Sequence, residues 1–277
     1  MNTPSRPRAT KIICTIGPAT DTSDMLGQLI EAGANVFRLN MSHSKHDWVR
    51  EVVFRIRRKA AELEANVAIL FDLQGPSIRT GDLAEPYHLK KGDTVEIRLG
   101  TAKPELPFST TVNYDGLLQD VQAGHTMVVD NGGILMRIAE VRPDRLICDV
   151  LTEGVFGSRR HINLPGVALR LPALTEKDLA DLAVAVECET DYVAMSFVRD
   201  AAHIAQLREH IDNLGGKAQI VAKIEDQQAV RHIDDIILAA DVIMVARGDL
   251  GIEVSIEELP IIQRRIAIAT GWDAAAS

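Results

Sequence analysis

The sequence has little of what marks disulfide-rich, nucleic-acid-binding or membrane proteins. Its three cysteines, Cys14, Cys148 and Cys188, form no CxxC pair, so we expect free thiols in a reducing compartment, by default the cytoplasm. Asp and Glu number 39 against 30 Lys and Arg, and without a basic stripe we expect no nucleic-acid partner. No apolar run approaches the roughly 18 residues of a membrane helix, so we expect no membrane span.

The sequence is rich in the pattern of buried strands. Six near-continuous apolar runs end in polar or glycine residues: KIICTIG, NVFRLNMSH, VAILFDLQG, YVAMSFVRD, IVAKIED and VIMVARGD. Such runs are typical of parallel strands buried on both faces. Helical spacing follows most of them, as at Ile204, Leu207 and Ile211, and capping boxes at Thr175 and Ser255 predict two helix starts. This alternation predicts an α/β fold, and periodicity alone leaves a doubly wound sheet and a barrel both open.

A β-rich segment interrupts the α/β series after its third strand. The period changes to two over residues 83–165, and the tripeptide NGG at Asn131 is typical of a hairpin turn. We therefore expect an antiparallel β insert, with residues 1–82 before it and residues 166–277 continuing the α/β series after it.

The strand end VAKIED places a cation and an anion on one face. Alternation along a strand sends Lys223 and Glu225 to the same side. The next strand ends in ARGDLG, which adds Asp249 beside Gly248, where backbone N–H groups can approach an anion. Two carboxylates from adjacent strand ends suit Mg2+, and Lys223 would stabilise negative charge on a substrate. A structural ion pair is the alternative interpretation of Lys223 and Glu225.

Two further strand ends carry polar side chains. FRLNMSH supplies Arg38, a strong phosphate donor, with the oxygens of Asn40 and Ser42, and DLQGPSIRTG supplies Asp72 and Arg79. A hydrogen-bonded cluster without a ligand is the alternative. Taken together, the residues predict a Mg2+-dependent enzyme that acts on a phosphorylated or carboxylated small molecule.

Seven motifs in order resemble the pyruvate kinase family: TKIICTIGPAT, FRLNMSHS, FDLQGPSIRTG, NLPGVALRLPALTEKD, AMSFVR, VAKIED and IMVARGDLGIE. The similarity runs from Lys11 to about Ile266. It implies a TIM-type (β/α)8 barrel with a β-barrel lid domain inserted after strand three. It also implies phosphoryl transfer from phosphoenolpyruvate to ADP, giving pyruvate and ATP in glycolysis.

The resemblance implies a role for each site residue. Arg38 would hold the phosphate of phosphoenolpyruvate, and Lys223 would stabilise the transferring phosphoryl group and the enolate. Glu225 and Asp249 would bind Mg2+, and the backbone of Gly248 and Asp249 would receive the substrate carboxylate. The side chains of Asn40, Ser42 and Asp72 and the carbonyl of Leu73 would bind K+. Arg79 and Arg160 would contact the nucleotide.

The sequence departs from the family at two places. Ser77 stands where relatives carry Glu or Lys, which leaves the K+ requirement open. Six of eight barrel strands are recognisable before the polar segment GWDAAAS, so we expect a truncated barrel that is less stable than its length suggests, and a homo-oligomer is possible. The alternatives are an inactive pyruvate kinase fragment that acts through binding, or a Mg2+-dependent lyase or aldolase, against which the lid and the nucleotide-site arginines argue.

Overall fold

The computed structural model describes residues 10–271, and the segment GWDAAAS lies outside them from its second residue on. Within that range each of the six apolar runs contains a strand of one parallel sheet, which confirms the strand prediction. The strands are β1 (Ile13–Ile16), β2 (Val36–Asn40), β3 (Ala68–Asp72), β12 (Tyr192–Met195), β13 (Gln219–Ile224) and β14 (Val242–Val245).

The order of strands in this sheet follows their order in the chain. It runs β1-β2-β3-β12-β13-β14, and each adjacent pair is parallel. A doubly wound sheet reverses its order at a switch point, whereas a barrel adds each strand to the same side. The topology therefore decides for the barrel type. In the described part of the chain β1 and β14 each pair on one side, so the sheet is an open arc.

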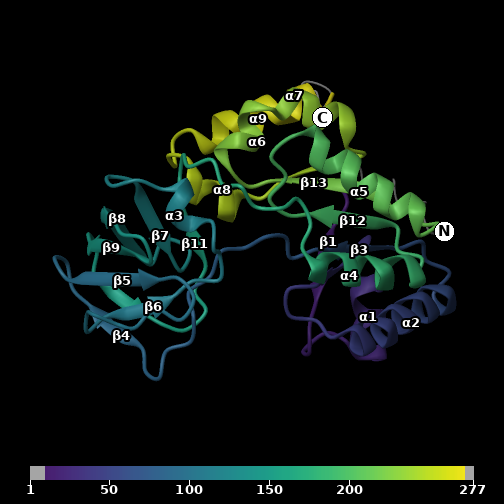
Figure 1. The fold of residues 1–277 in the computed structure, drawn as a ribbon. Coiled ribbons are helices and arrows are strands. Elements are labelled where there is room, and N and C mark those ends of the chain that lie inside the picture. The colour runs from purple at the N-terminus through teal and green to yellow at the C-terminus, as the bar shows by residue number, and fades with distance from the viewer. Residues whose placement is uncertain (1–9, 272–277) are drawn as a thin grey trace.

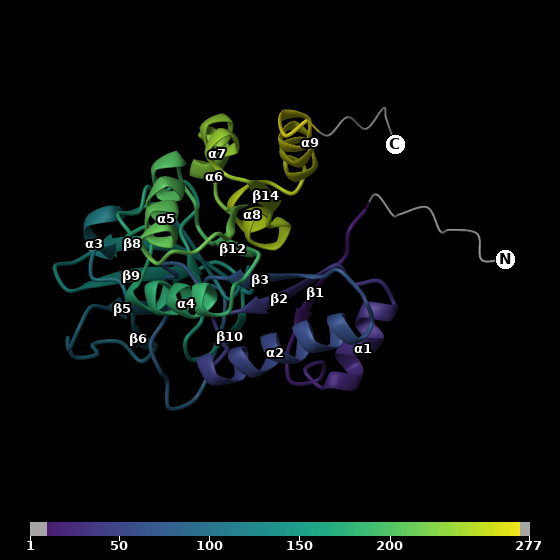
Figure 2. The same ribbon diagram turned by 90° about the vertical axis from the view of Figure 1, so that its right-hand side faces the viewer.

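Helices cover the outside of this arc, and each touches the next (Figure 2). They are α1 (Ser23–Glu31), α2 (His46–Glu62), α4 (Glu176–Glu187), α5 (Ala201–Asn213), α7 (Ile233–Ala239) and α9 (Leu259–Ala269), with the short α6 (Gln227–Arg231) and α8 (Arg247–Glu253) directly after β13 and β14. Side chains alternate along each strand, so Phe71 packs toward the helices while Leu70 joins a small cluster inside the arc. Both faces of the strands are therefore buried.

The β insert forms a lobe beside the parallel sheet (Figure 1), and it has its own hydrophobic core. Its elements are β4 (Tyr87–Leu89), β5 (Thr94–Arg98), β6 (Ser109–Thr111), α3 (Leu117–Asp120), β7 (Thr126–Val129), β8 (Ile134–Val141), β9 (Arg145–Val150), β10 (Gly154–Phe156) and β11 (Ile162–Asn163). The predicted hairpin at Asn131 joins β7 and β8. The expected antiparallel pairing needs one correction, because β5 and β6 are parallel and the sheet is mixed. Residues between these two strands form a crossover connection rather than a tight turn.

The two predicted capping boxes have different outcomes. Thr175 caps α4 as expected, since its hydroxyl accepts from the Asp178 amide and the Asp178 carboxylate accepts from the Thr175 amide. At Ser255 the capping box forms only in part: Glu258 Oε2 accepts from the Ser255 amide at 3.3 Å, but a turn follows, and α9 begins at Leu259, next to Pro260. Proline fits the first turn of a helix because no intrahelical partner is needed for its nitrogen there. Among residues 10–271, no helix is long and apolar enough to cross a membrane.

Candidate active site

A charged cavity of about 340 Å3 lies at the carboxyl ends of the parallel strands, where the insert faces them. Ligands bind at this end of parallel α/β sheets and barrels. The cavity brings together the following residues that the sequence singled out: Arg38, Asn40, Ser42, Asp72, Leu73, Ser77, Arg79, Arg160, Lys223, Glu225 and Asp249. Of the predicted site residues, Gly248 alone does not line the cavity. Gly248 lies in the first turn of α8.

Lys223 is the centre of the cavity's polar network. It follows Val221 on the interior face of β13, where Val221 packs inside the arc, so alternation along the strand places the ammonium above that apolar layer. Its Nζ lies 2.8 Å from Glu225 Oε1 and 3.2 Å from Asp72 Oδ1, and it donates to Ser196 Oγ at 2.7 Å. Three oxygens from three strand ends thus hold the ammonium in place.

Burial and ion pairing have opposite effects on the pKa values of Lys223 and Glu225. Burial lowers the pKa of Lys223, but the carboxylates of Glu225 and Asp72 outweigh it and hold the pKa above its ordinary value. Burial likewise raises the pKa of Glu225, although the Lys223 ammonium opposes the shift. The Phe197 amide also donates to Glu225 Oε2 at 2.7 Å, which favours the carboxylate form. Lys223 is therefore a firmly charged cation rather than a base.

Arg38 is held against Asp72 on the neighbouring strand. Its Nε donates to Asp72 Oδ2 at 2.7 Å, and its NH1 donates to Thr15 Oγ1 at 2.8 Å. The side chain of Asp72 is 2% exposed, whereas that of Arg38 is 26% exposed, so the guanidinium reaches the cavity from a buried anchor. Asp72 thus orients two cations, Arg38 and Lys223, toward one space.

Neutral oxygens line the same side of the cavity. Asn40 Oδ1 accepts from the Ser42 amide at 3.1 Å, and the Leu73 carbonyl accepts from Ser196 Oγ at 2.8 Å. Together with the Asp72 carboxylate, these groups form a set of hard oxygen donors, which is the donor type for an alkali or alkaline-earth cation.

Two carboxylates of the cavity fit a divalent cation. Glu225 and Asp249 both line the cavity, at the end of β13 and in the first turn of α8. No group of three or more His, Cys, Asp or Glu side chains within residues 10–271 could hold a metal by itself. Mg2+ takes one or two protein carboxylates and completes its octahedron with water and substrate phosphate, so a two-carboxylate site fits this ion.

The surroundings of Gly248 are consistent with a ligand nearby. A Cβ added there would meet no described atom within 4 Å. Packing within the protein therefore does not require glycine at this position. The N–H groups at the start of α8 have no intrahelical partner, as in any helix.

Two further cations line the cavity, Arg79 just before the insert and Arg160 within it. Arg79 Nε donates to Ser77 Oγ at 3.0 Å, and Arg160 lies 3.3 Å from Asp130 Oδ1 through its NH1. Arg160 Nε is buried and has no hydrogen-bond partner among the described residues. Ser77 Oγ therefore accepts from Arg79 and helps to hold its guanidinium in place.

The backbone around this cavity is strained. Of the six non-glycine residues with positive φ in the described part of the chain, four line the cavity: Asp130, Asn131, Arg159 and Phe197. Each such conformation costs on the order of 1–3 kcal/mol, and such residues concentrate at functional sites.

Sequence reasoning missed several residues of the site. Ser196 follows the apolar run of β12 in the same way that Asp72 follows that of β3, so the strand-end rule could have found it. His161 lies on the cavity wall, and burial lowers its pKa, with Arg79 adding to the effect. No spacing in the sequence distinguishes this histidine, because the insert brings it to the site from outside the parallel sheet.

The fold and the cavity define a class: a barrel-type α/β protein whose charged cavity suits a phosphorylated anion together with a divalent cation. The sequence matches the family described as "Pyruvate kinase, barrel domain" over residues 7–272. The chain therefore belongs to the pyruvate kinase barrel-domain family.

Curated relatives agree with this assignment. Plastidial pyruvate kinase 2 of Arabidopsis thaliana is 40% identical over 266 residues, covering 95% of this chain and 45% of the relative. Pyruvate kinase of Mycobacterium tuberculosis is 39% identical over 259 residues, covering 93% and 55%. Pyruvate kinase of Geobacillus stearothermophilus is 40% identical over 261 residues, covering 93% and 44%. The chain spans about half the length of these relatives.

Proposed function

We propose that the charged cavity binds phosphoenolpyruvate with Mg2+ and that the chain transfers its phosphoryl group to ADP, giving pyruvate and ATP. The position of Lys223 Nζ, which contacts Glu225, Asp72 and Ser196 beside Arg38, carries this proposal. Phosphoryl transfer needs positioned cations more than covalent chemistry by the protein, and this cavity offers fixed cations. Family membership supports the same reaction.

Arg38 binds the substrate phosphate and Lys223 stabilises both the phosphoryl group in flight and the enolate left behind. Glu225 and Asp249 hold Mg2+, which when bound neutralises charge on the phosphoryl oxygens. The backbone amides of Gly248 and Asp249 receive the substrate carboxylate. Lys223 stays charged and is not the proton donor, so the enolate takes from water the proton that completes pyruvate.

The remaining groups bind the second cation and the second substrate. The side chains of Asn40, Ser42 and Asp72 and the carbonyl of Leu73 hold K+, and Arg79 and Arg160 contact the nucleotide. The unpartnered Arg160 Nε supports the nucleotide assignment, since a buried donor needs an acceptor. Because Ser77 is neutral, we expect turnover to depend on K+ rather than on a cation supplied by the protein.

The compartment we propose is the cytoplasm, where Cys14, Cys148 and Cys188 remain reduced; none is paired in the structure. The Arabidopsis relative is named as a plastidial enzyme, so a plastid is the alternative compartment.

A second candidate is binding of phosphoenolpyruvate and Mg2+ without turnover. The observation that favours it is coverage, because this chain spans about half of each relative's length. The two candidates share the same cavity and differ in whether it is sufficient for transfer.

ATP formation from phosphoenolpyruvate and ADP, measured with Mg2+ in K+ and then in Na+, tests the proposal. Turnover in K+ with a marked loss in Na+ supports transfer and the K+ site. A folded chain that binds phosphoenolpyruvate and forms no ATP supports the binding candidate, and a folded chain that does neither refutes both.

A further inference from the structure

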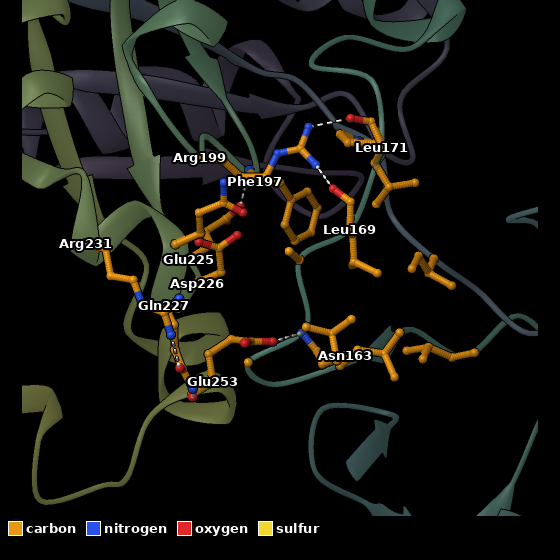
Figure 3. A pocket seen from close by; sticks show the side chains of 18 of the residues that line it. Asn163, Leu169, Leu171, Phe197, Arg199, Glu225, Asp226, Gln227, Arg231 and Glu253 are labelled. Atoms are coloured by element: carbon orange, nitrogen blue, oxygen red, sulfur yellow. Dashed lines mark hydrogen bonds between the residues drawn. The ribbon is translucent and has the colours of Figure 1, made fainter. Parts of the chain in front are cut away.

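A second cavity, of about 250 Å3, lies between the insert and the ends of β12 and β13 (Figure 3). It is adjacent to the charged cavity, and His161, Phe197 and Glu225 line both. One wall is apolar and comes from the chain around and after β11: Ile162, Leu164, Val167, Leu169 and Leu171. The opposite wall is polar and comes from α6, the residue before it and the end of α8: Asp226, Gln227, Gln228, Arg231 and Glu253.

Two buried hydrogen-bond acceptors on these walls lack adequate donors. Glu253, the last residue of α8, is 9% exposed, and among the described residues its carboxylate has one donor, Asn163 Nδ2 at 3.5 Å. Asn163 is 7% exposed, and its Oδ1 has no hydrogen-bond partner within residues 10–271. Figure 3 shows the Asn163 and Glu253 side chains approaching each other across the cavity. Buried acceptors in this state are destabilising until a donor reaches them.

The two arginines that line the cavity, Arg199 and Arg231, donate hydrogen bonds to groups other than Glu253 and Asn163. The Arg199 guanidinium donates to the carbonyls of Leu169 and Leu171, at 2.8 and 2.5 Å, as Figure 3 shows. Arg231 donates to Gln227 Oε1 at 3.4 Å. Burial and then the neighbouring Asp226 carboxylate raise the pKa of Glu253 to about 7, and a cation bound beside this carboxyl would stabilise its ionised form.

We propose that this second cavity binds a small organic cation that carries at least two N–H donors on a short apolar body, namely an amidinium or a primary ammonium. The donors satisfy the Glu253 carboxylate and Asn163 Oδ1, and the apolar body packs against Leu164 and Leu169. An anion would face the Glu253 carboxylate and Asn163 Oδ1, which are both acceptors, and a hydrocarbon would leave both acceptors unpaired. The inference rests on these contacts and does not depend on the proposed function.

Titration calorimetry of the full chain with benzamidine and with benzamide tests this site. The two probes share a ring and differ in charge and donor number. We expect benzamidine to bind at least about tenfold more tightly, since its donors form charge-assisted hydrogen bonds. Glu253→Gln should remove that preference, whereas Glu257→Gln, which removes an equal charge at an exposed position outside the cavity, should keep it.

Amide NMR on the unmodified chain provides a test that does not depend on how the variants fold. Benzamidine should shift the side-chain amide signal of Asn163 together with backbone signals of the Leu164–Leu171 segment. Equal affinity for the two probes, a preference retained in Glu253→Gln, no binding, or shifts centred on another part of the chain would each overturn the proposal.

Discussion

At the scale of single residues, the site depends on side chains that alternate along strands. Val221 and Lys223 share the interior face of β13, and one packs in an apolar layer while the other extends into the cavity. The charge of Lys223 is maintained by carboxylates from β3 and from the end of β13 itself. This arrangement makes the ammonium a fixed electrostatic element.

Replacing this ammonium tests its role. Lys223→Met keeps the length and apolar stem of the side chain but removes the charge, so we expect the rate of phosphoryl transfer to fall at least about 100-fold. The affinity for Mn2+, measured by electron paramagnetic resonance as a substitute for Mg2+, should change by less than about threefold, because lysine is not a metal ligand. Where the chain forms no ATP, phosphoenolpyruvate affinity is the property that should fall.

Lys217→Met is the matched control, because Lys217 is exposed near the opposite end of β13. Lys217→Met removes the same charge and should leave the rate of phosphoryl transfer and the affinity for Mn2+ unchanged. An equal loss of metal affinity in Lys223→Met would show that the role assigned to Lys223 is wrong.

The sequence predicts individual site residues to the extent that local alternation determines their direction. Lys223, Glu225, Arg38 and Asp72 could be predicted because each lies in or just after the carboxyl-terminal half of a strand. The contact of Asp72 with Arg38 and Lys223 could not, because it depends on strands being neighbours in the sheet. Asn163 and Glu253 meet only because the insert folds back onto α8, which no local pattern indicates.

At the scale of elements, the start of α4 links the helix layer to the site. The Asp178 carboxylate accepts from the Thr175 amide at 2.8 Å and also from the amide of Gly75, at 3.0 Å, in the loop after β3. One buried carboxylate therefore fixes a helix start and a loop at the cavity.

Substitutions of Thr175 and Asp178 should lower the free energy of unfolding by different amounts. Thr175→Ala removes the hydrogen bond that the hydroxyl accepts from the Asp178 amide and the one it donates to the Asp178 carboxylate, and we expect it to lower the free energy of unfolding by about 1 kcal/mol. Asp178→Ala also leaves the Gly75 amide buried without an acceptor, so we expect a loss of about 2–3 kcal/mol. Urea unfolding followed by circular dichroism measures both, and equal effects would mean that the Gly75 contact contributes nothing.

A buried ion pair stabilises the insert. Glu96 on β5 is 0% exposed and lies 2.7 Å from Arg145 on β9. Glu96→Gln leaves the largely buried Arg145 with weaker compensation, and we expect a loss of about 3 kcal/mol in the free energy of unfolding. Glu140→Gln, which breaks a half-exposed pair with Arg142, should cost less than about 1 kcal/mol. A similar loss in both variants would contradict the importance given to burial.

The pH dependence of this pair has a definite sign. Burial raises the pKa of Glu96, but hydrogen bonds from Ser109, the amides of Glu105 and Leu106, and Arg145 outweigh it and hold the pKa below the ordinary 4.5. A carboxyl with a depressed folded-state pKa stabilises the protein above its unfolded value, and this stabilisation is lost as pH falls through the folded value. We expect unfolding free energy to decline below about pH 4.5 in wild type, and Glu96→Gln to show a shallower decline.

Sequence periodicity predicted most elements but not their pairing. The six parallel strands and the capping box at Thr175 follow from local patterns, and the start of α9 differs because Pro260 favours a first-turn position. Strand order, and the parallel pairing of β5 with β6, depend on contacts between distant segments. Those contacts have no period in the sequence.

At the scale of the whole molecule, apolar side chains gather on the exposed surface of the α7–α9 end of the arc. Leu238, Ile256, Ile261 and Ile268 are 86%, 69%, 70% and 62% exposed. Helix α9 packs against α7 and α8, so these side chains belong to adjoining elements. Exposed apolar surface of this kind favours association.

We expect the chain to self-associate through this surface. Ile261 and Ile268 are seven residues apart and so lie on one face of α9. Sedimentation velocity should show concentration-dependent association that the double variant Ile261→Glu/Ile268→Glu reduces. Phe54→Glu, which changes an exposed apolar residue on α2, is the control and should leave association unchanged. A monomer at all concentrations, with a single cooperative melt at high temperature, would contradict this expectation.

The most direct test of the account is calorimetric titration of phosphoenolpyruvate into the folded chain, with and without Mg2+. We predict one site per chain, with affinity that rises on adding Mg2+ because Glu225 and Asp249 would hold the ion beside the substrate phosphate. Absence of binding by folded protein, or affinity that is the same with and without Mg2+, would contradict it.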